Sequence, residues 1–514
     1  MKRIAIAVFA ALLIGLTPAF GTASSSDSEK KTGAGADVLR ERAALKDIIA
    51  QTQQTHPDAA AIRDALKTLI ADPSFWSLTD TERHAGYVLY GAVLYDLKDY
   101  LGAKDQIVQA TQMADAGDFD WGLRASNSFY LRDFVDVARA VTKLAQSWPK
   151  KLADFNDDAF LTIAREAATH RDADDVTLAY VSAMHAIHWK PVDPFKNADS
   201  LWVVETRLKL ERGDSDGAKA AAADLQSPAT FVELRSDKRF DTVIQAAPAH
   251  FDVAKANAAM LAEVRAKVAA APDKLEGVNT LADLLLGQDH ADEALAAVSD
   301  ALARLKDKPD AFSDTDDYVN WSHDVRSRAL FALGRSDEAL AAMAQGAAHS
   351  ENGAVNVSQS INLADSYDDF DKPNEALAAV AGLDFSNASP YGRMALEDAR
   401  ACALVQLGNK TALDPVLAYM KAHVADGAQP YLNAMLCAGD LDAVAAEIVA
   451  ELDDPARRQA MLFRLQDFLP DRHPSPRESA KHAAWLAVRG RPDVVAAIAR
   501  VGRVESYPLT DPEY

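Results

Sequence analysis

The sequence predicts an all-α protein built as a solenoid of antiparallel helix pairs. A short phrase, Asp-Glu-Ala-Leu-Ala-Ala-Val, begins at Asp292 and returns in close variants at Asp337 and Asn374, each time after a polar turn. From Val38 onward apolar residues recur with helical period, and alternating strand patterns are almost absent. Short breaks with Gly, Asp, Asn or Pro separate the predicted helices. One amphipathic pair cannot bury its own apolar stripe, so repeated pairs are expected to stack into one continuous core.

The first 23 residues have the features of an export signal. Two basic residues precede an apolar run from Ile4 to Leu16, and small residues lead to Ala23. The run is shorter than the roughly 20 residues that span a bilayer. We therefore expect residues 1–23 to be a signal peptide cleaved near Ala23, followed by a disordered leader at 24–36. The mature chain would be periplasmic or secreted, without a membrane span, and an uncleaved anchor is the alternative.

Length and charge limit the classes of fold and partner. At 514 residues the chain is too long for one compact core. It has 76 acidic and 54 basic residues, a net charge of −22. Phosphate-binding proteins need the opposite balance, which argues against a nucleic-acid partner. The acidic residues are spread along the chain, as is typical of a well-solvated surface.

The two cysteines, Cys402 and Cys437, are too few for a disulfide-rich scaffold. Both lie in apolar helical runs, where a buried unpaired thiol is the commoner outcome. The alternative is a single bridge between neighbouring repeats, which an oxidising compartment would permit.

Several apolar and small residues recur at fixed spacing in both halves of the chain. They are Tyr87, Tyr90, Gly91, Leu94, Ala103, Ile107 and Ala110, then Trp121, Ala125, Val137, Val141, Leu144 and Pro149, and later Val278, Leu281, Ala282, Leu285, Ala294, Val298 and Ala301. This spacing resembles the tetratricopeptide-repeat family, whose helix pairs repeat about every 34 residues. The resemblance covers residues 80–225 and 275–381. It implies a right-handed superhelix whose inner wall, made by the first helix of each pair, binds a protein or peptide.

The pattern divides the chain into segments. Residues 226–250 contain two prolines and a charged cluster and are predicted to be a hinge, and the acidic insert 309–317 is predicted to be a loop or an extended helix end. The expected order is an N-terminal solenoid at 37–225, the hinge at 226–250, central repeats at 251–385, divergent helical hairpins at 386–503 and an irregular tail at 504–514.

The repeat register predicts which side chains face the groove. These candidates are Tyr95, Ser126 and Phe129 in the first half, and Asn279, Asp283, Trp321, Arg328, Phe331, Asp365 and Asp368 in the second. Trp and Arg are frequent interface anchors, although Trp321 would also fit packing against the preceding hairpin. The Lys and Asn clamp by which some members of the family hold a carboxylate tail is missing, and a polar or basic segment suits the second groove better than an acidic one.

The sequence leads to three functional hypotheses. The first is an exported, non-enzymatic scaffold of a bacterial type of envelope that recruits a protein or peptide. The second is a hydrolase of wall polymer that uses Asp283, Asp365 and Asp368. The third is a structural spacer. Glycine-rich phosphate loops, GxSxG elbows and HExxH helices are absent from the sequence, and no catalytic residue, cofactor or metal site is predicted.

Overall fold

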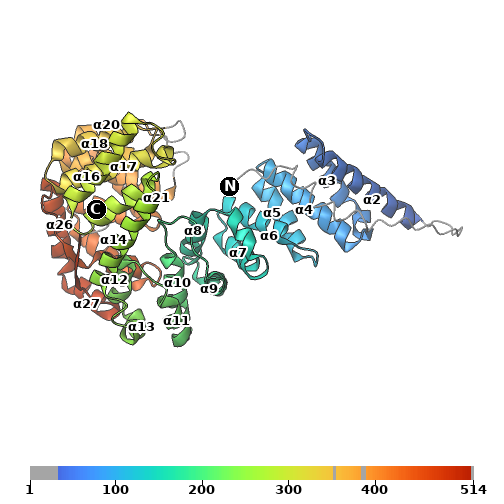
Figure 1. The fold of residues 1–514 in the computed structure, drawn as a ribbon, viewed down its shortest axis with the longest axis horizontal. Helices are drawn as coiled ribbons and strands as arrows, with labels where there is room; N and C mark the ends of the chain where they lie inside the picture. Colours follow the sequence, from blue (N-terminus) through green and yellow to red (C-terminus); the bar gives the residue numbers. More distant parts are fainter. Residues whose placement is uncertain (1–32, 351–354, 384–388, 511–514) are drawn as a thin grey trace. The chain divides into compact units, whose positions relative to one another are not determined.

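The computed structural model describes residues 33–350, 355–383 and 389–510 (Figure 1). The expected signal peptide and residues 24–32 of the expected leader lie outside these ranges, whereas residues 33–36 of that leader are not disordered but begin the first described helix. Within them the chain is helical almost throughout, and each helix packs mainly on the next to form antiparallel pairs. The prediction of an all-α solenoid of helix pairs is confirmed. No described helix combines the length and the apolar character needed to cross a membrane.

The chain forms two compact units. Unit 1 comprises the described residues up to Val192 together with Ser200–Ala221, and unit 2 comprises Asp193–Asp199 and the described residues from Ala222 onward. Unit 1 contains α2 (Gly33–Thr52), α3 (Ala59–Ala71), α4 (Asp80–Asp96), α5 (Tyr100–Gln112), α6 (Asp118–Tyr130), α7 (Phe134–Ser147), α8 (Asp157–Ala167), α9 (Asp174–Ala186), most of α10 (Asp199–Glu211) and of α11 (Ser215–Ala222), and 3-10 turns at Pro73–Ser77, Pro149–Asp154 and Arg171–Ala173.

Local sequence sets the helix ends and the close contacts of unit 1. Thr79 and Glu82 form a capping box at the start of α4, and Asp99 caps α5 with a bond from the Gly102 amide. A Cβ atom at Gly91 would lie only 2.6 Å from Ile107 Cγ1, so α4 and α5 cross too closely for any side chain at position 91. The small residues of the predicted repeat therefore lie where the two helices cross.

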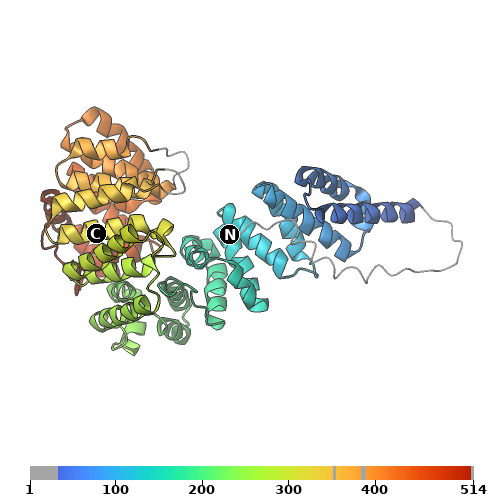
Figure 2. The ribbon, with the colours of Figure 1, turned by 45° about the horizontal axis from the view of Figure 1, so that its top comes forward.

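Unit 2 contains the larger part of the array, and Figure 2 shows its later pairs stacked in yellow and orange. Its elements are α12 (Pro228–Ser236), α13 (Asp241–Ala246), α14 (Val253–Ala270), α15 (Leu275–Leu286), α16 (Ala291–Asp307), α17 (Thr315–Ala332), α18 (Ser336–Ala348), α19 (Val357–Asp369), α20 (Pro373–Val380), α21 (Pro390–Gln406), α22 (Lys410–Ala422), α23 (Ala428–Ala438), α24 (Leu441–Asp453), α25 (Arg458–Arg464), α26 (Pro476–Arg489), α27 (Pro492–Val501), strands β1 (Asp467–Leu469) and β2 (Ser506–Thr510), and 3-10 turns at Lys238–Phe240 and Val424–Asp426.

The acidic insert at 309–317 is both a loop and an extended helix end. Helix α16 ends at Asp307 and α17 begins at Thr315, so the loop passes into the first turn of α17. Asp314 accepts hydrogen bonds from the backbone amides of Leu275 and Glu276, at 2.8 and 3.2 Å, and so caps α15.

The expected hinge at 226–250 is instead part of the folded body of unit 2. Pro228 is the first residue of α12. Proline is tolerated there because amide groups in the first turn of a helix have no hydrogen-bond acceptor within the helix. Phe231, Val232 and Leu234 are buried, and α12 packs against α14 and α25. The prolines that suggested flexibility therefore mark a helix start, and burial of these three side chains excludes a hinge.

The expected irregular tail at 504–514 is also wrong over its described part. Residues Ser506–Thr510 form β2, which pairs in parallel with β1. Arg503 binds both carboxylate oxygens of Asp241, and the Thr510 amide donates to the Gly287 carbonyl at 3.0 Å. These contacts join residues 503–510 to α13 and to the end of α15, so the last described residues of unit 2 pack on its earlier elements.

Substitution of Ala294, where α15 and α16 cross, tests the packing of unit 2. Ala294 is fully buried on α16, whereas Ala296 is exposed on the same helix. We expect Ala294→Leu to lower the free energy of unfolding by about 1–3 kcal/mol, because the larger side chain forces α15 and α16 apart. Ala296→Leu is the matched control and should change stability by less than about 0.5 kcal/mol. Urea unfolding followed by circular dichroism measures both, and equal effects of the two variants would contradict the predicted crossing.

Candidate functional site

The first helices of successive pairs form one continuous surface in unit 2. We call the surface made by α15, α17, α19, α21 and α23 the inner wall. Helix α15 packs on α17, and α21 packs on both α19 and α23. A hydrogen bond of 3.1 Å from Asn362 Nδ2 to Asp324 Oδ1 links α19 to α17. All seven groove candidates of the second half lie on these helices. The register read from the sequence therefore placed them on one wall.

A segment from the C-terminal part of the chain covers part of this wall. We call residues 470–489, which include α26, the covering segment. Helix α26 packs against α19, α23 and α24. Before the helix starts, Arg472 pairs with Asp289 and the His473 ring lies against Gly334. The segment thus passes the ends of α15 and α17 before it reaches α19.

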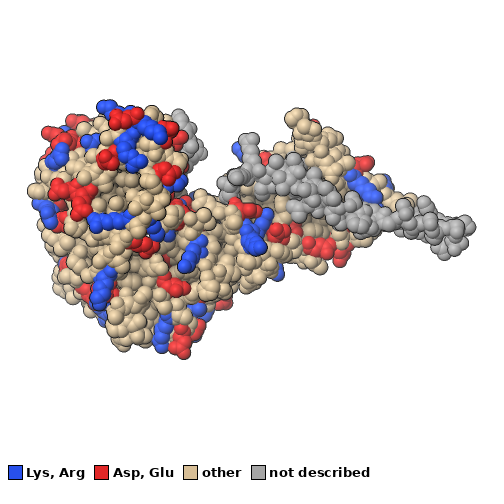
Figure 3. All heavy atoms as spheres, viewed as in Figure 1, with Lys and Arg blue, Asp and Glu red and all other residues tan. Residues whose placement is uncertain are grey.

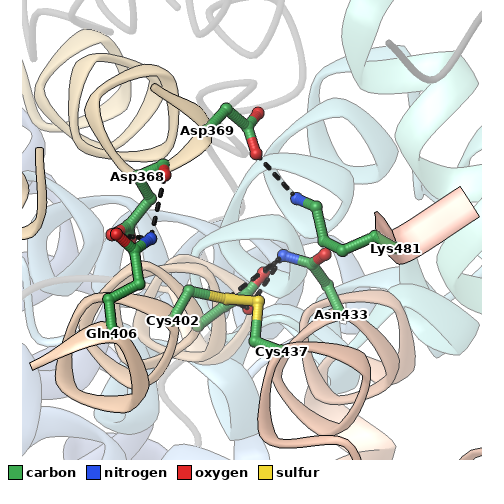
Figure 4. The surroundings of a disulfide bond; sticks show 8 residues. Asp368, Asp369, Cys402, Gln406, Asn433, Cys437 and Lys481 are labelled. Carbon is green, nitrogen blue, oxygen red and sulfur yellow. Dashed lines mark hydrogen bonds and ion pairs between the residues drawn. A yellow bond between two sulfur atoms is a disulfide. The ribbon is translucent and has the colours of Figure 1, made fainter. Parts of the chain in front are cut away.

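Two ion pairs attach α26 itself. Arg477 Nε lies 2.6 Å from Asp371 Oδ1, and Lys481 Nζ lies 3.0 Å from Asp369 Oδ1 (Figure 4). Arg477 and Lys481 are four residues apart and so share one face of α26. That face is basic and lies against acidic residues at the end of α19.

A pocket lies between α26 and the wall. Its lining includes Asp365, Asp368 and Asp369 of α19, Cys402 and Gln406 of α21, Asn433 and Cys437 of α23, and Arg477 and Lys481 of α26. Its volume is about 120 Å³, whereas sites for small molecules usually measure about 300–1,000 Å³. The pocket fits a side chain or a few waters better than a metabolite.

Three carboxyl groups at this pocket, those of Asp365, Asp368 and Asp398, have raised pKa values. Burial, and then the charge of Asp369, raise the pKa of Asp365 to about 7. Burial, and then the charges of Asp365 and Asp369, raise the pKa of Asp368 to about 8. Burial also raises the pKa of Asp398, which accepts bonds from Asn433 Nδ2 at 2.9 and 3.0 Å. Lys481 opposes all three shifts through its positive charge.

Asp368 has one carboxylate oxygen that is buried without a partner. Only 3% of its surface is exposed, and its Oδ1 accepts a bond from Gln406 Nε2 at 3.1 Å. Its other carboxylate oxygen, Oδ2, is buried without a hydrogen-bond partner. An unmet acceptor in a pocket is costly, and it favours either a proton or a further donor at this position.

The two cysteines form a disulfide, which corrects the expectation of unpaired thiols. Cys402 on α21 and Cys437 on α23 are 35 residues apart, close to one repeat, and their Cα atoms lie 5.3 Å apart. They therefore occupy equivalent places on neighbouring first helices. The bridge ties two helices of the inner wall together beside the pocket (Figure 4).

Several predicted groove residues stabilise the wall instead of facing a ligand. Asn279 is buried, donates to the Tyr318 carbonyl at 3.1 Å and accepts from Ser322 Oγ at 2.8 Å. Arg328 pairs with both Asp283 and Asp324. These contacts link α15 to α17, so Asn279 and the Asp283–Arg328 pair are already occupied within the fold.

The aromatic candidates of unit 2 differ in exposure. Phe331 stacks on Phe370 with ring centres 5.0 Å apart. Trp321 remains 40% exposed on α17. Trp321 is therefore the large accessible aromatic side chain among the candidates of this unit, and this exposure leaves open the alternative that the rest of the side chain packs against the preceding hairpin.

The candidates of unit 1 belong to a small aromatic cluster. Tyr95 contacts the edges of Tyr100 and Tyr130, and those two rings stack with centres 4.5 Å apart. Ser126 is buried and shares a hydrogen bond with Tyr95, while Phe129 packs edge-on against Phe134. The repeat register selected Phe129 and missed the next residue, Tyr130, which is 46% exposed. Tyr130 lies 35 residues after Tyr95, which is about one repeat. This spacing could have identified Tyr130 as a groove candidate.

Comparisons with known proteins add little to this geometry. No family model matches the sequence, and no curated protein matches it. Among solved structures, the chain is similar to one in the crystal structure of the APC/C hetero-tetramer Cut9-Hcn1, over 97% of this chain and 96% of that one. The sequence identity is 13% and the TM-score 0.27, so the likeness carries no argument about function.

The stability of unit 2 is expected to fall as the pH rises from about 5 to about 8. Folded Asp365 and Asp368 have pKa values of about 7 and about 8, whereas an unfolded aspartate has a pKa of about 4. Between these values the folded state binds more protons than the unfolded state, so a rise in pH favours unfolding. Because one pKa unit corresponds to about 1.4 kcal/mol, we expect a loss of about 2–5 kcal/mol.

Urea unfolding at pH 5 and pH 8 tests this expectation. The double variant Asp365→Asn, Asp368→Asn should lose most of the pH dependence. The matched control is Asp292→Asn, which removes an exposed carboxylate on α16 and should keep the wild-type dependence. A wild-type stability that stays level or increases between the two pH values would show that these carboxylates are not buried in their protonated form.

Reduction of the Cys402–Cys437 bridge should lower the stability of unit 2 by about 4 kcal/mol, because it frees a loop of 35 residues in the unfolded chain. Thermal unfolding with and without dithiothreitol measures the change. A Cys402→Ala, Cys437→Ala variant should melt at a lower temperature in both conditions and should not respond to the reductant. An unchanged wild-type melting temperature after complete reduction would contradict the prediction.

Proposed function

We propose that this chain is an exported, non-enzymatic scaffold that recruits a protein or peptide through the first-helix surfaces of its repeats. The observation that carries the proposal is the exposure of large aromatic side chains on these surfaces. Trp321 on α17 and Tyr130 at the end of α6 remain accessible, while neighbouring aromatic rings pack on one another. Tyr and Trp supply much of the binding energy at protein interfaces.

Surface charge and the disulfide support the same proposal. On the face drawn in Figure 3, acidic and basic side chains are interspersed and no broad basic field is visible. Such a surface suits a protein partner better than a nucleic acid. The Cys402–Cys437 bridge accords with export, since structural disulfides persist in oxidising compartments. A bacterial type of envelope is the natural setting for the signal-like N-terminus.

The hydrolase hypothesis has less support. Asp365 and Asp368 line one small pocket beneath α26, and Asp283 is paired with Arg328 and is not among the pocket residues. A polymer substrate would need an open cleft that brings the acid and base to one bond. Replacing the three aspartates together by asparagine would separate the two ideas, because only a hydrolase would lose a wall-degrading activity.

Photo-crosslinking in cells that export the protein tests the scaffold proposal. With p-benzoylphenylalanine at position 321 or 130, we expect a discrete protein adduct that mass spectrometry identifies. Position 341, exposed on the second helix α18, is the matched control and should not give that adduct. The identified protein, once purified, should bind Trp321→Ala or Tyr130→Ala at least ten-fold more weakly than the wild type. No adduct at either site, or the same adducts at 341, would overturn the proposal.

A further inference from the structure

The covering segment lies on the inner wall where a bound partner would lie, and it is held there with little apolar burial. Of the residues of α26, only Val488 is fully buried, and Trp485 packs partly buried against the same apolar cluster. By contrast, five residues of α23 and five of α24 are buried. Helices with few buried apolar contacts open most readily. Helix α26 therefore resembles a docked ligand more than a core element.

Ionic contacts supply most of the specific attachment. The side chains of Arg472 and Arg477 are exposed by 65% and 46% in their pairs with Asp289 and Asp371. Exposed pairs of this kind contribute at most about 1 kcal/mol each. The Lys481–Asp369 pair on the wall is more shielded, and so is Arg489 at the end of α26, which pairs with Asp467 of β1. A competing chain would have to replace two weak ion pairs on the wall and the firmer Lys481–Asp369 pair.

The wall beneath α26 has an excess of acceptors. Asp365, Asp368, Asp369 and Asp398 gather around Lys481, with Arg477 at the pocket edge. The buried Asp368 Oδ2 has no hydrogen-bond partner. A guanidinium group presents five donors in a planar fork, whereas an ammonium group presents three. An arginine entering this pocket could meet the acceptor that the present arrangement leaves unmet.

We propose that the inner wall around Asp365, Asp368 and Asp369 is a docking site for a cationic amphipathic helix of a partner protein, and that α26 is an internal stand-in which this helix displaces. The inference rests on the proposed scaffold function and adds the chemistry of one partner and the way the site is regulated. Charge complementarity specifies the occupant: a helix with Arg or Lys four residues apart, as Arg477 and Lys481 are on α26.

The test uses the full chain and a defined probe. Arg477→Ala and Lys481→Ala together remove the two ion pairs that hold α26 to Asp369 and Asp371, and neither side chain belongs to the apolar core. The probe is a fluorescein-labelled synthetic peptide of residues 474–490. We expect fluorescence anisotropy to show micromolar binding to the double variant and binding at least ten-fold weaker to the wild type. His482→Ala, an exposed change on α26, is the matched control and should behave as wild type.

Further experiments test whether the peptide binds at these aspartates and whether α26 is released. Adding Asp365→Asn, Asp368→Asn and Asp369→Asn to the double variant should abolish peptide binding, and a peptide with Glu at positions 477 and 481 should not bind. Hydrogen exchange should show α26 less protected in the double variant than in the wild type, with α24 unchanged.

The inference is overturned if α26 stays fully protected in the double variant, if the peptide fails to bind, or if the triple change leaves binding intact. None of these results would affect the cross-links expected at positions 321 and 130. Failure of the docking inference can therefore be distinguished from failure of the scaffold proposal.

Discussion

The close approach of paired helices is the constraint on which the rest of the structure depends. Two helices can share a buried stripe only if small residues lie where their backbones cross. Ala294, Ala339 and Ala376 are buried at the three copies of the repeated phrase, and Gly91 has the same role where α4 meets Ile107 of α5. Because the two helices of each pair lie close together at their crossing, the next pair can stack on them and extend the same wall. The site exists because that wall is continuous.

The contacts between the last described residues of unit 2 and its earlier elements give the covering segment its unusual position. Upstream, β1 pairs with β2, and downstream α27 packs on α24, so both ends of the segment are fixed. A helix tethered in this way has a high effective concentration at its binding surface. Weak contacts then suffice to keep it in place, which accounts for an attachment made of ion pairs and little apolar burial. A strongly packed helix at the same concentration could not be displaced.

The sequence predicted what depends on local period and missed what depends on distant contacts. The repeated spacing located the crossing alanines and placed Asp365 and Asp368 on one helix of the inner wall. It could not show that residues 226–250 pack against α25, or that Ser506–Thr510 pairs with β1, because those partners lie more than thirty residues away. Asn279 faces a neighbouring carbonyl in place of solvent for the same reason. The expected export left a bridge between neighbouring repeats possible, but the apolar helical context of both cysteines favoured free thiols.

The charges at the wall connect proton binding with docking of α26. Like charges beneath the helix can be relieved either by protons, as the raised pKa values of Asp365 and Asp368 indicate, or by the cations of α26. Burial also raises the pKa of Glu478 on α26. A carboxyl group of α26 itself therefore also binds a proton more readily in the folded state. Proton binding and cation binding at one site are reciprocal: each weakens the other by the same free energy. Protonation of the wall at low pH therefore loosens α26, whereas deprotonation strengthens its hold and that of any cationic helix competing with it. The competition between the two helices is then decided by how well each donor set fits the buried oxygen of Asp368, since the wall charge attracts both alike.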